Sequence, residues 1–402
     1  MKRYFTMKLF SAGLILVAWF TFAIMNLTQN AEGLWNKIEA TGHSVTEFTL
    51  FPDTFDAFAN QDVFSKMSLI ETYGFLQKLM LKNEENNFEV VKDTDGKLHY
   101  ATFADGPNDV KEIVNAVSAL NRALFSTESK LTVLMPPDKV LQGVTTFDEA
   151  LPYSYHNETA DRFLEAMLLR GINAIDFRDA ILTSGIPPKD IFFDTDHHWT
   201  IESNFWAFTH LLEQLNEIYD LDLDPDGFYT DPENYNFITY EKSYLGSMGR
   251  KTGVIYAGAD DFTVIFPKFE TKYRFDAFNP LYEVHSEGRF EDALIIGYPF
   301  NIQNFEQSIN TDKYFAYLQG NQSIVTIKNE LSDGPRVLII KDSMSVPMTA
   351  FLSTVCSEVV LIDPRFYEEN IIEYAIQGEF DHVIVSIYPQ NLTPEFFDYN
   401  TK

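Results

Sequence analysis

Near its carboxyl end the chain alternates buried strands with helices, and this alternation restricts the fold more than any other feature. Continuous apolar runs in RVLIIK (336–341), EVVLID (358–363) and HVIVSIY (382–388) are typical of strands that are buried on both faces. Helical segments at 343–356 and 367–377 separate them. Strands that alternate with helices predict an α/β fold with a parallel sheet covered on both faces.

The same alternation begins earlier in the chain. LTVLMPP (131–137) predicts a buried strand, RFLEAMLLRGI (162–172) a helix, and AIDFRDAIL (174–182) begins as a strand. IFFDTDHHW (191–199) predicts a further strand, and Thr200 is suited to cap the helix IESNFWAFTHLLEQL that follows. The main domain is therefore expected to span residues 86–402.

Two segments of the chain differ from this pattern. Residues 220–290 contain short β runs, such as GVIYA (253–257) and FTVIF (262–266), between turn residues, which predicts a β-rich insertion. Residues 32–85 have helical apolar spacing and are expected to form a helical approach segment.

The amino terminus carries a localisation signal. Lys2, Arg3 and Lys8 precede an uncharged, mostly apolar run to Ala31 that is about long enough to span a bilayer. Positive charge before such a run predicts a cytoplasmic amino end and an exported remainder. Residues 1–31 are therefore expected to be a single-pass membrane anchor, with the main domain extracytoplasmic, and a cleaved signal peptide is the alternative.

Charge and cysteine content exclude some classes of protein. The net charge of −29 argues against a nucleic-acid partner, because phosphate binding needs clustered Lys and Arg. With Cys356 as the only cysteine, an internal disulfide and a cysteine-based zinc site cannot form.

The segment DTDHHW concentrates carboxylates, imidazoles and an indole. In an extended segment residues two apart point to the same side, so Asp194, Asp196 and His198 would share one face, with His197 on the other. Asp196 is then the natural carboxylate to hold and orient the His198 ring. A pair of histidines that caps the next helix is the structural alternative.

A serine follows the strand RVLIIK in the segment KDSMS (341–345). Strand, Asp-Ser and helix together place Ser343 on a tight turn, with its backbone N–H at a helix N-terminus, where negative charge is favoured. An acyl-transfer nucleophile needs this arrangement, although a serine at a helix start is also common as a simple cap. Ser343 and His198 both lie where strands end, so one site could contain both.

These segments resemble known families. VLIIKDS with the units after it resembles the Gly-Asp-Ser block of SGNH hydrolases, and the Asp-x-His-Trp pattern resembles the SGNH-like domains of alginate O-acetyltransferases. DHHW matches the bacterial family that is named for that motif, and LTVLMPPDK is similar to the segment that opens those domains. Lys341 stands where the SGNH block has Gly.

The resemblance implies a flavodoxin-like SGNH fold and a Ser-His-Asp triad. Ser343 would be the nucleophile, His198 the general base and Asp196 its orienting carboxylate, and the histidine precedes the serine, which is permuted relative to ordinary SGNH esterases. Candidates for substrate binding or oxyanion stabilisation are Trp199, Arg250, Arg365, Tyr388, Gln390 and Asn391.

The implied function is O-acyl transfer, most simply O-acetylation of a cell-envelope or secreted polysaccharide. A membrane-bound O-acyltransferase would supply the acyl group, and no cofactor is expected. A carbohydrate esterase on the same triad is one alternative, and a non-catalytic envelope scaffold or glycan-binding protein is another.

Metal binding is a different chemistry for the same segment. Asp194, Asp196, His197 and His198 are all possible ligands. Adjacent histidines in a strand diverge, however, and no further ligand cluster stands out, so no metal is expected.

Overall fold

The computed structural model describes residues 2–41, 63–85, 87–101, 103–149, 151, 153–280 and 282–400. The chain divides into two compact units, Met1–Leu76 and Gln77–Lys402. The first unit begins with α1 (Lys2–Thr41), whose stretch Arg3–Asn30 is long and apolar enough to cross a membrane.

The expected helical approach segment is described in part. Residues 42–62 lie outside the described residues. Beyond them, α3 (Lys66–Leu79) is helical, as its apolar spacing predicts.

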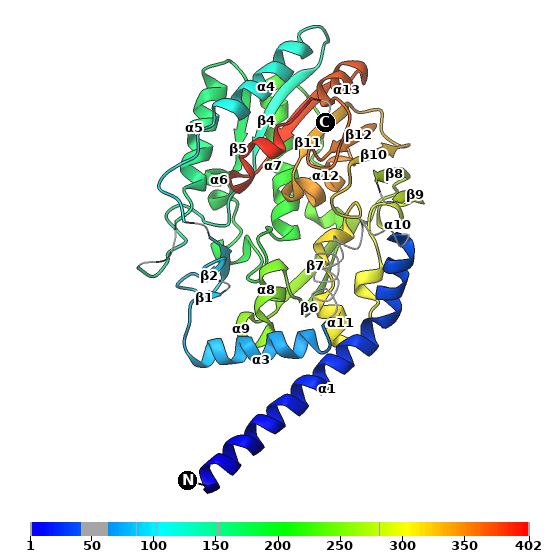
Figure 1. Cartoon of the computed structure of the whole chain (residues 1–402). Coiled ribbons are helices and arrows are strands. Elements are labelled where there is room, and N and C mark those ends of the chain that lie inside the picture. Colours follow the sequence, from blue (N-terminus) through cyan, green and yellow to red (C-terminus); the bar gives the residue numbers. More distant parts are fainter. Residues whose placement is uncertain are drawn as a thin grey trace. The chain divides into compact units, whose positions relative to one another are not determined.

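An eight-stranded sheet forms the core of the second unit, with the order β5-β4-β13-β11-β12-β10-β8-β9 (Figure 1). Five neighbouring strands run parallel, and all five were predicted as strands: β4 (Lys130–Met135), β5 (Asn173–Asp176), β11 (Arg336–Lys341), β12 (Glu358–Ile362) and β13 (His382–Ser386). The sheet is nevertheless mixed, because β10 (Ile324–Asn329), β8 (Tyr273–Asn279) and β9 (Tyr282–Gly288) extend it as antiparallel neighbours.

The parallel strands have a permuted flavodoxin-like order. If counting starts at β11 and passes through β12 and β13 back to β4 and β5, the strands lie in the order 2-1-3-4-5. β4, which comes first of the five in the chain, therefore takes the place of the fourth strand of a flavodoxin-like sheet. The expected α/β class and flavodoxin-like sheet are confirmed.

Helices cover both faces of the parallel strands. One face packs against α4 (Lys111–Leu124), α5 (His156–Leu168) and α13 (Ile371–Gln377). The other face packs against α7 (Ile201–Tyr219) and α12 (Val346–Leu352). Alternate residues of β11 illustrate the division: Leu338 and Ile340 belong to the first core, and Val337 and Ile339 to the second.

The region 220–290 is rich in strands, but it does not form one separate sheet. β6 (Tyr235–Tyr244) and β7 (Asp260–Pro267) pair with each other, whereas β8 and β9 join the main sheet. The short helices α8 (Ser247–Thr252) and α9 (Val254–Ala257) lie between β6 and β7 in sequence, and α10 (Phe290–Ala293) and α11 (Phe305–Asn310) follow β9. A small antiparallel sheet of β1 (Glu84–Glu85), β2 (Val90–Lys92) and β3 (Leu98–Tyr100) precedes α4.

The predicted strand at GVIYA is wrong, because Val254–Ala257 form α9. Gly253 and Gly258 flank this segment with φ of 84° and 83°, values that end a strand. Backbone N–H groups of Ala257 and Gly258 donate back to Gly253 and Val254, which closes the helical turn.

Candidate functional site

The DTDHHW segment is a turned loop and not the strand that the sequence predicts. Only Phe192 and Trp199 form an antiparallel bridge, and residues 194–198 bend between them. The loop ends at Thr200, whose hydroxyl accepts a hydrogen bond from the N–H of Ser203 and caps α7, as predicted. The bend turns the Asp196 and His198 side chains toward each other.

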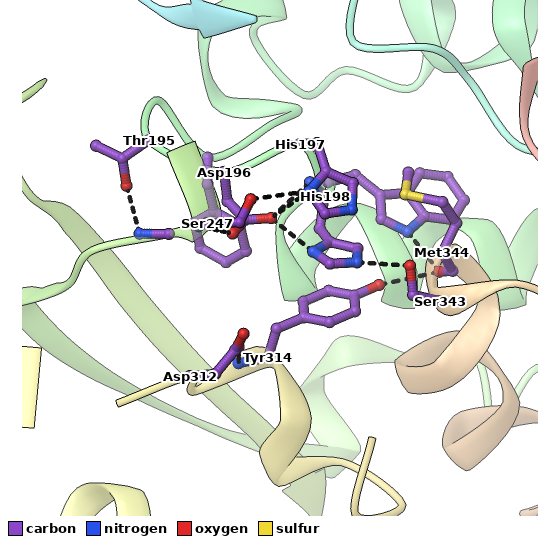
Figure 2. A network of polar contacts seen from close by, with 12 residues as sticks. Thr195, Asp196, His197, His198, Ser247, Asp312, Tyr314, Ser343 and Met344 are labelled. Carbon is purple, nitrogen blue, oxygen red and sulfur yellow. Dashed lines mark hydrogen bonds and ion pairs between the residues drawn. The ribbon is translucent and has the colours of Figure 1, made fainter. Parts of the chain in front are cut away.

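Two side chains of this loop and one from 145 residues further along the chain form a hydrogen-bonded series. Asp196 Oδ1 lies 2.6 Å from His198 Nδ1, and His198 Nε2 lies 2.8 Å from Ser343 Oγ. Figure 2 shows the His198 ring between the other two side chains. With the proton on Nδ1, His198 donates to Asp196 and Nε2 accepts from the Ser343 hydroxyl, which is the arrangement that a general base requires.

Asp196 is fully buried and kept ionised by its neighbours. Burial alone would raise its pKa, but the neighbouring His198 and His197 rings and hydrogen bonds from His198 and the Ser247 N–H lower the pKa well below its usual value. The Ser247 N–H donates to Asp196 Oδ2 over 2.5 Å, and the Tyr244 hydroxyl lies 3.1 Å from the same oxygen. A carboxylate with several donors stays negative beside the imidazole.

Ser343 lies at the first position of a short 3₁₀ turn after β11. Asp342 caps this turn by accepting from the Met344 N–H, and its other oxygen accepts from the Tyr388 N–H and from Asn391 Nδ2. No acceptor for the Ser343 N–H is found within the described part of the chain. This free donor at the start of a turn could stabilise an oxyanion.

Two aromatic side chains connect the histidine loop to the serine turn. Tyr314 stacks on the His198 ring, with 3.9 Å between centroids, and its hydroxyl donates to the Met344 carbonyl (Figure 2). Trp199 donates through Nε1 to the same carbonyl at 2.8 Å. The two contacts fix the distance between His198 and Ser343.

Trp199, a candidate for substrate binding in the sequence, does not line an open site. Its side chain is fully buried, so it cannot touch a substrate in this structure. The indole instead stabilises the loop through its hydrogen bond to the Met344 carbonyl.

His197 lies beside the series and not on the opposite side of the segment. Its ring is 3.8 Å from that of His198, and Nδ1 is 3.0 Å from Ser247 Oγ. Burial and the neighbouring His198 lower the pKa of His197 to about 3, so it is uncharged at neutral pH.

The remaining candidates have protein partners of their own. Arg365 binds the Asp363 carboxylate with two nitrogens, and Arg250 binds Asp312 at 2.9 Å. The Tyr388 hydroxyl donates to Gln390, while Asn391 holds Asp342. The structure thus places Tyr388 and Asn391 next to the serine turn, and both arginine side chains are committed to carboxylates.

Lys341 does not interfere with the serine turn. Its side chain is buried, and Nζ donates to Asn321 and lies 3.2 Å from Asp363. Burial lowers its pKa, and Asp363 opposes this shift.

The carboxylate and histidines that could ligate a metal are close together. Ligand atoms of Asp196, His197 and His198 lie within 4.8 Å of one another. Both ring nitrogens of His198, however, have protein partners, and Asp194 pairs with Lys97 at 2.8 Å. A metal would have to displace these interactions.

Gly246 lets the polypeptide approach Asp196 closely, which leads to a first prediction. A Cβ at Gly246 would lie 2.3 Å from the Asp196 Cβ and 2.5 Å from Oδ2. We expect Gly246→Ala to destabilise the protein by about 1–3 kcal/mol, as overpacking does, measured by thermal unfolding. Gly106→Ala is the control, because a Cβ there meets nothing within 4 Å, and equal stability of the two variants would contradict the prediction.

Sequence reasoning missed several residues of the site: Asp342, Tyr244 and Tyr314. Arg250 was a candidate in the sequence, and within the same segment GSMGR (246–250) it is Gly246 and the Ser247 N–H that make the close contacts with Asp196. No local pattern marks Tyr314, because its role depends on tertiary packing.

Two family models match the chain. The model for the SGNH hydrolase-like domain of the acetyltransferase AlgX matches residues 98–232, and the DHHW protein model matches residues 182–362. No curated protein matches the sequence. The expected resemblance to both groups is confirmed.

Solved structures share the fold. Bacillus cereus PatB1 with a sulfonyl adduct has a TM-score of 0.61 and 17% identity, over 78% of this chain and 97% of that one. A DHHW family protein from Eubacterium siraeum has a TM-score of 0.56 and 16% identity, over 78% of this chain and 98% of that one. At such identities the likeness establishes the SGNH-like α/β fold.

Proposed function

We propose that this chain, which is related to SGNH-like acetyltransferases, is an O-acyltransferase that uses Ser343, His198 and Asp196. The series of contacts from Asp196 through His198 to Ser343, at 2.6 and 2.8 Å, is the observation that carries the proposal. The match to an acetyltransferase domain supports acetyl as the transferred group.

The first half of the reaction forms an acyl-enzyme. Ser343 Oγ attacks the carbonyl carbon of an acyl donor while its proton passes to His198 Nε2. The Ser343 N–H stabilises the oxyanion, and His198 returns the proton to the leaving group as the donor bond breaks. Asp196 remains ionised and stabilises the imidazolium.

The second half transfers the acyl group to an acceptor. An acceptor hydroxyl attacks the Ser343 ester, its proton passes to His198, and Ser343 leaves with that proton. We propose a sugar hydroxyl of a cell-envelope or secreted polysaccharide as the acceptor. The apolar stretch of α1 would anchor the domain outside the membrane, where a membrane-bound O-acyltransferase could supply the acyl group.

An assay with an activated acetyl ester tests this function. We expect the full chain to transfer acetyl to a polysaccharide acceptor, detected by mass spectrometry, and the acceptor to speed the turnover of the ester. Rapid acetate release that no acceptor changes would favour the esterase alternative. Acceptor binding without any turnover would favour a glycan-binding scaffold.

A further inference from the structure

The loop that carries Asp196 and His198 is held from one side by a buried lysine. Lys139 Nζ donates to the backbone carbonyls of Phe193 at 2.6 Å, Asp194 at 3.1 Å and Asp196 at 2.7 Å. An ammonium group has three N–H bonds, so these contacts use all of its donors. The residue is 7% exposed.

A buried carboxylate holds another side of the same loop. Asp260 Oδ1 accepts from the Asp194 N–H at 2.6 Å, and Oδ2 accepts from the Thr195 N–H at 2.9 Å and from the Thr195 hydroxyl at 2.5 Å. This residue is 8% exposed. The loop therefore lies between a cation on its carbonyls and an anion on its amides.

These contacts add to the few backbone hydrogen bonds that the loop has. Its one β-bridge joins Phe192 and Trp199, and the N–H groups of Leu98 and Gly249 donate to the Asp194 and Thr195 carbonyls. Buried backbone groups without partners are costly, so the remaining groups of the loop need partners as well. Because all of these contacts except that of the Thr195 hydroxyl are to backbone atoms at 193–196, the two charged groups fix the path of the chain next to His198. A small shift of that path would lengthen the 2.8 Å contact between His198 and Ser343.

We propose that Lys139 and Asp260 are positioning residues, whose two charges hold the Asp196–His198 loop in its catalytic conformation. This inference rests on the proposed function of Ser343. Neither residue touches Ser343 in this proposal, and both act through the loop backbone.

Both groups lie at the edge of a hollow in the protein. Lys139 lines a hollow of about 270 Å³, which His99 and Lys97 also line, and Asp260 lines a separate one of about 880 Å³. Burial lowers the pKa of Lys139 to about 8, and the charge of Lys97 lowers it further. The carboxylates of Asp260, Asp194 and Asp196 oppose this shift. Burial raises the pKa of Asp260 to about 6, and its bonds from Asp194 and Thr195 oppose this.

These pKa values set the direction of the pH dependence. Asp260 loses its negative charge as the pH falls through about 6, and Lys139 loses its positive charge as the pH rises through about 8. The loop is held by both charges only between these limits. The loss of activity on the alkaline side is the more specific sign, because a general-base histidine limits activity on the acid side.

Substitution of Lys139 in the full chain tests the proposal, with an activated acetyl ester as the substrate. We expect Lys139→Met to lower kcat about 100-fold with little change in KM, since small misplacements of catalytic groups have effects of this size. Lys139→Arg keeps the charge and has the adjoining hollow for its larger head group. It should recover part of kcat, and its alkaline loss of activity should move above pH 8.

Two control variants separate positioning from general destabilisation. Lys92→Met removes another lysine that donates to a backbone carbonyl, that of Tyr256, and should keep wild-type kcat. Leu120→Ala opens a cavity in the core under α4 and should lower the melting temperature without a large loss of kcat. Asp260→Asn is the second test if Lys139→Met does not fold, with the same expected loss of kcat.

Each result has a defined meaning. The proposal is overturned if Lys139→Met, or Asp260→Asn in its place, keeps kcat within about threefold of wild type, or if Leu120→Ala loses as much kcat at equal loss of stability. A far-downfield proton NMR signal from the short bond between His198 and Asp196 should weaken in Lys139→Met, and an unchanged signal would also count against the proposal. If Ser343→Ala is as active as wild type, the proposed function itself fails.

Discussion

Replacement of Ser343 by alanine is expected to abolish acyl transfer, with a fall in kcat of about 10⁴-fold or more, as in other serine enzymes that lose their nucleophile. Without Oγ no acyl-enzyme can form, and the His198 base has no proton to remove. The measurement is turnover of an activated acetyl ester, together with mass spectrometry for an acetylated Ser343. An aromatic sulfonyl fluoride should label Ser343 in the wild type and leave the variant unlabelled.

The fold should tolerate this substitution. Asp342, and not Ser343, caps the 3₁₀ turn, so the variant loses only the hydrogen bond to His198. Ser118→Ala is a matched control, because Ser118 is also buried and donates to the Val114 carbonyl within α4. If Ser343→Ala kept more than about a tenth of the wild-type activity, covalent catalysis by this serine would be ruled out.

Asp196→Asn is expected to lower kcat by about 10³- to 10⁴-fold with the fold intact. The amide nitrogen of Asn can face His198 Nδ1 and stabilise the wrong tautomer, in which Nε2 carries a proton and cannot accept from Ser343. The measurement is kcat for the same ester across pH. Asp93→Asn is the control, because Asp93 binds the buried His99 at 2.8 Å outside the proposed triad.

The same variant tests the charge of Asp196 through stability. The folded-state pKa of Asp196 lies well below its usual value, so the carboxylate contributes stability above the unfolded-state pKa and loses it as the pH falls. Wild type should exceed Asp196→Asn in unfolding free energy above about pH 5, and the gap should narrow below about pH 4. A gap that is independent of pH would contradict a strongly ionised Asp196.

Local sequence patterns predicted the sheet better than they predicted the loop that meets it. Runs such as RVLIIK form strands because their side chains are apolar on both faces, and this needs no information from elsewhere. The DTDHHW segment follows the apolar residues IFF, so the local pattern predicts that it continues a strand. Its bend depends on Lys139, Asp260 and Gly246, which lie far away in the sequence.

The sequence also predicted only part of the geometry of the candidate site. The expectation that His198 and Ser343 come together agrees with their 2.8 Å contact, but its premise holds only for Ser343, which follows β11. His198 lies in a loop and not at the end of a parallel strand. Alternation along an extended chain then wrongly separated His197 from His198, since the loop is not extended. The support from Tyr314 and Tyr244 arises from packing between distant segments and leaves no local signal.

The place of β13 in the sheet has a consequence for biosynthesis. This strand is the last one along the described chain, yet it lies between β4 and β11 and joins the half of the sheet made first to the half that leads to Ser343. A ribosome makes His198 long before β13, which pairs with β11, the strand that leads to Ser343. We therefore expect the proposed activity to appear only after β13 has been inserted, and a truncation that removes β13 should leave two half-sheets without hydrolytic or transfer activity.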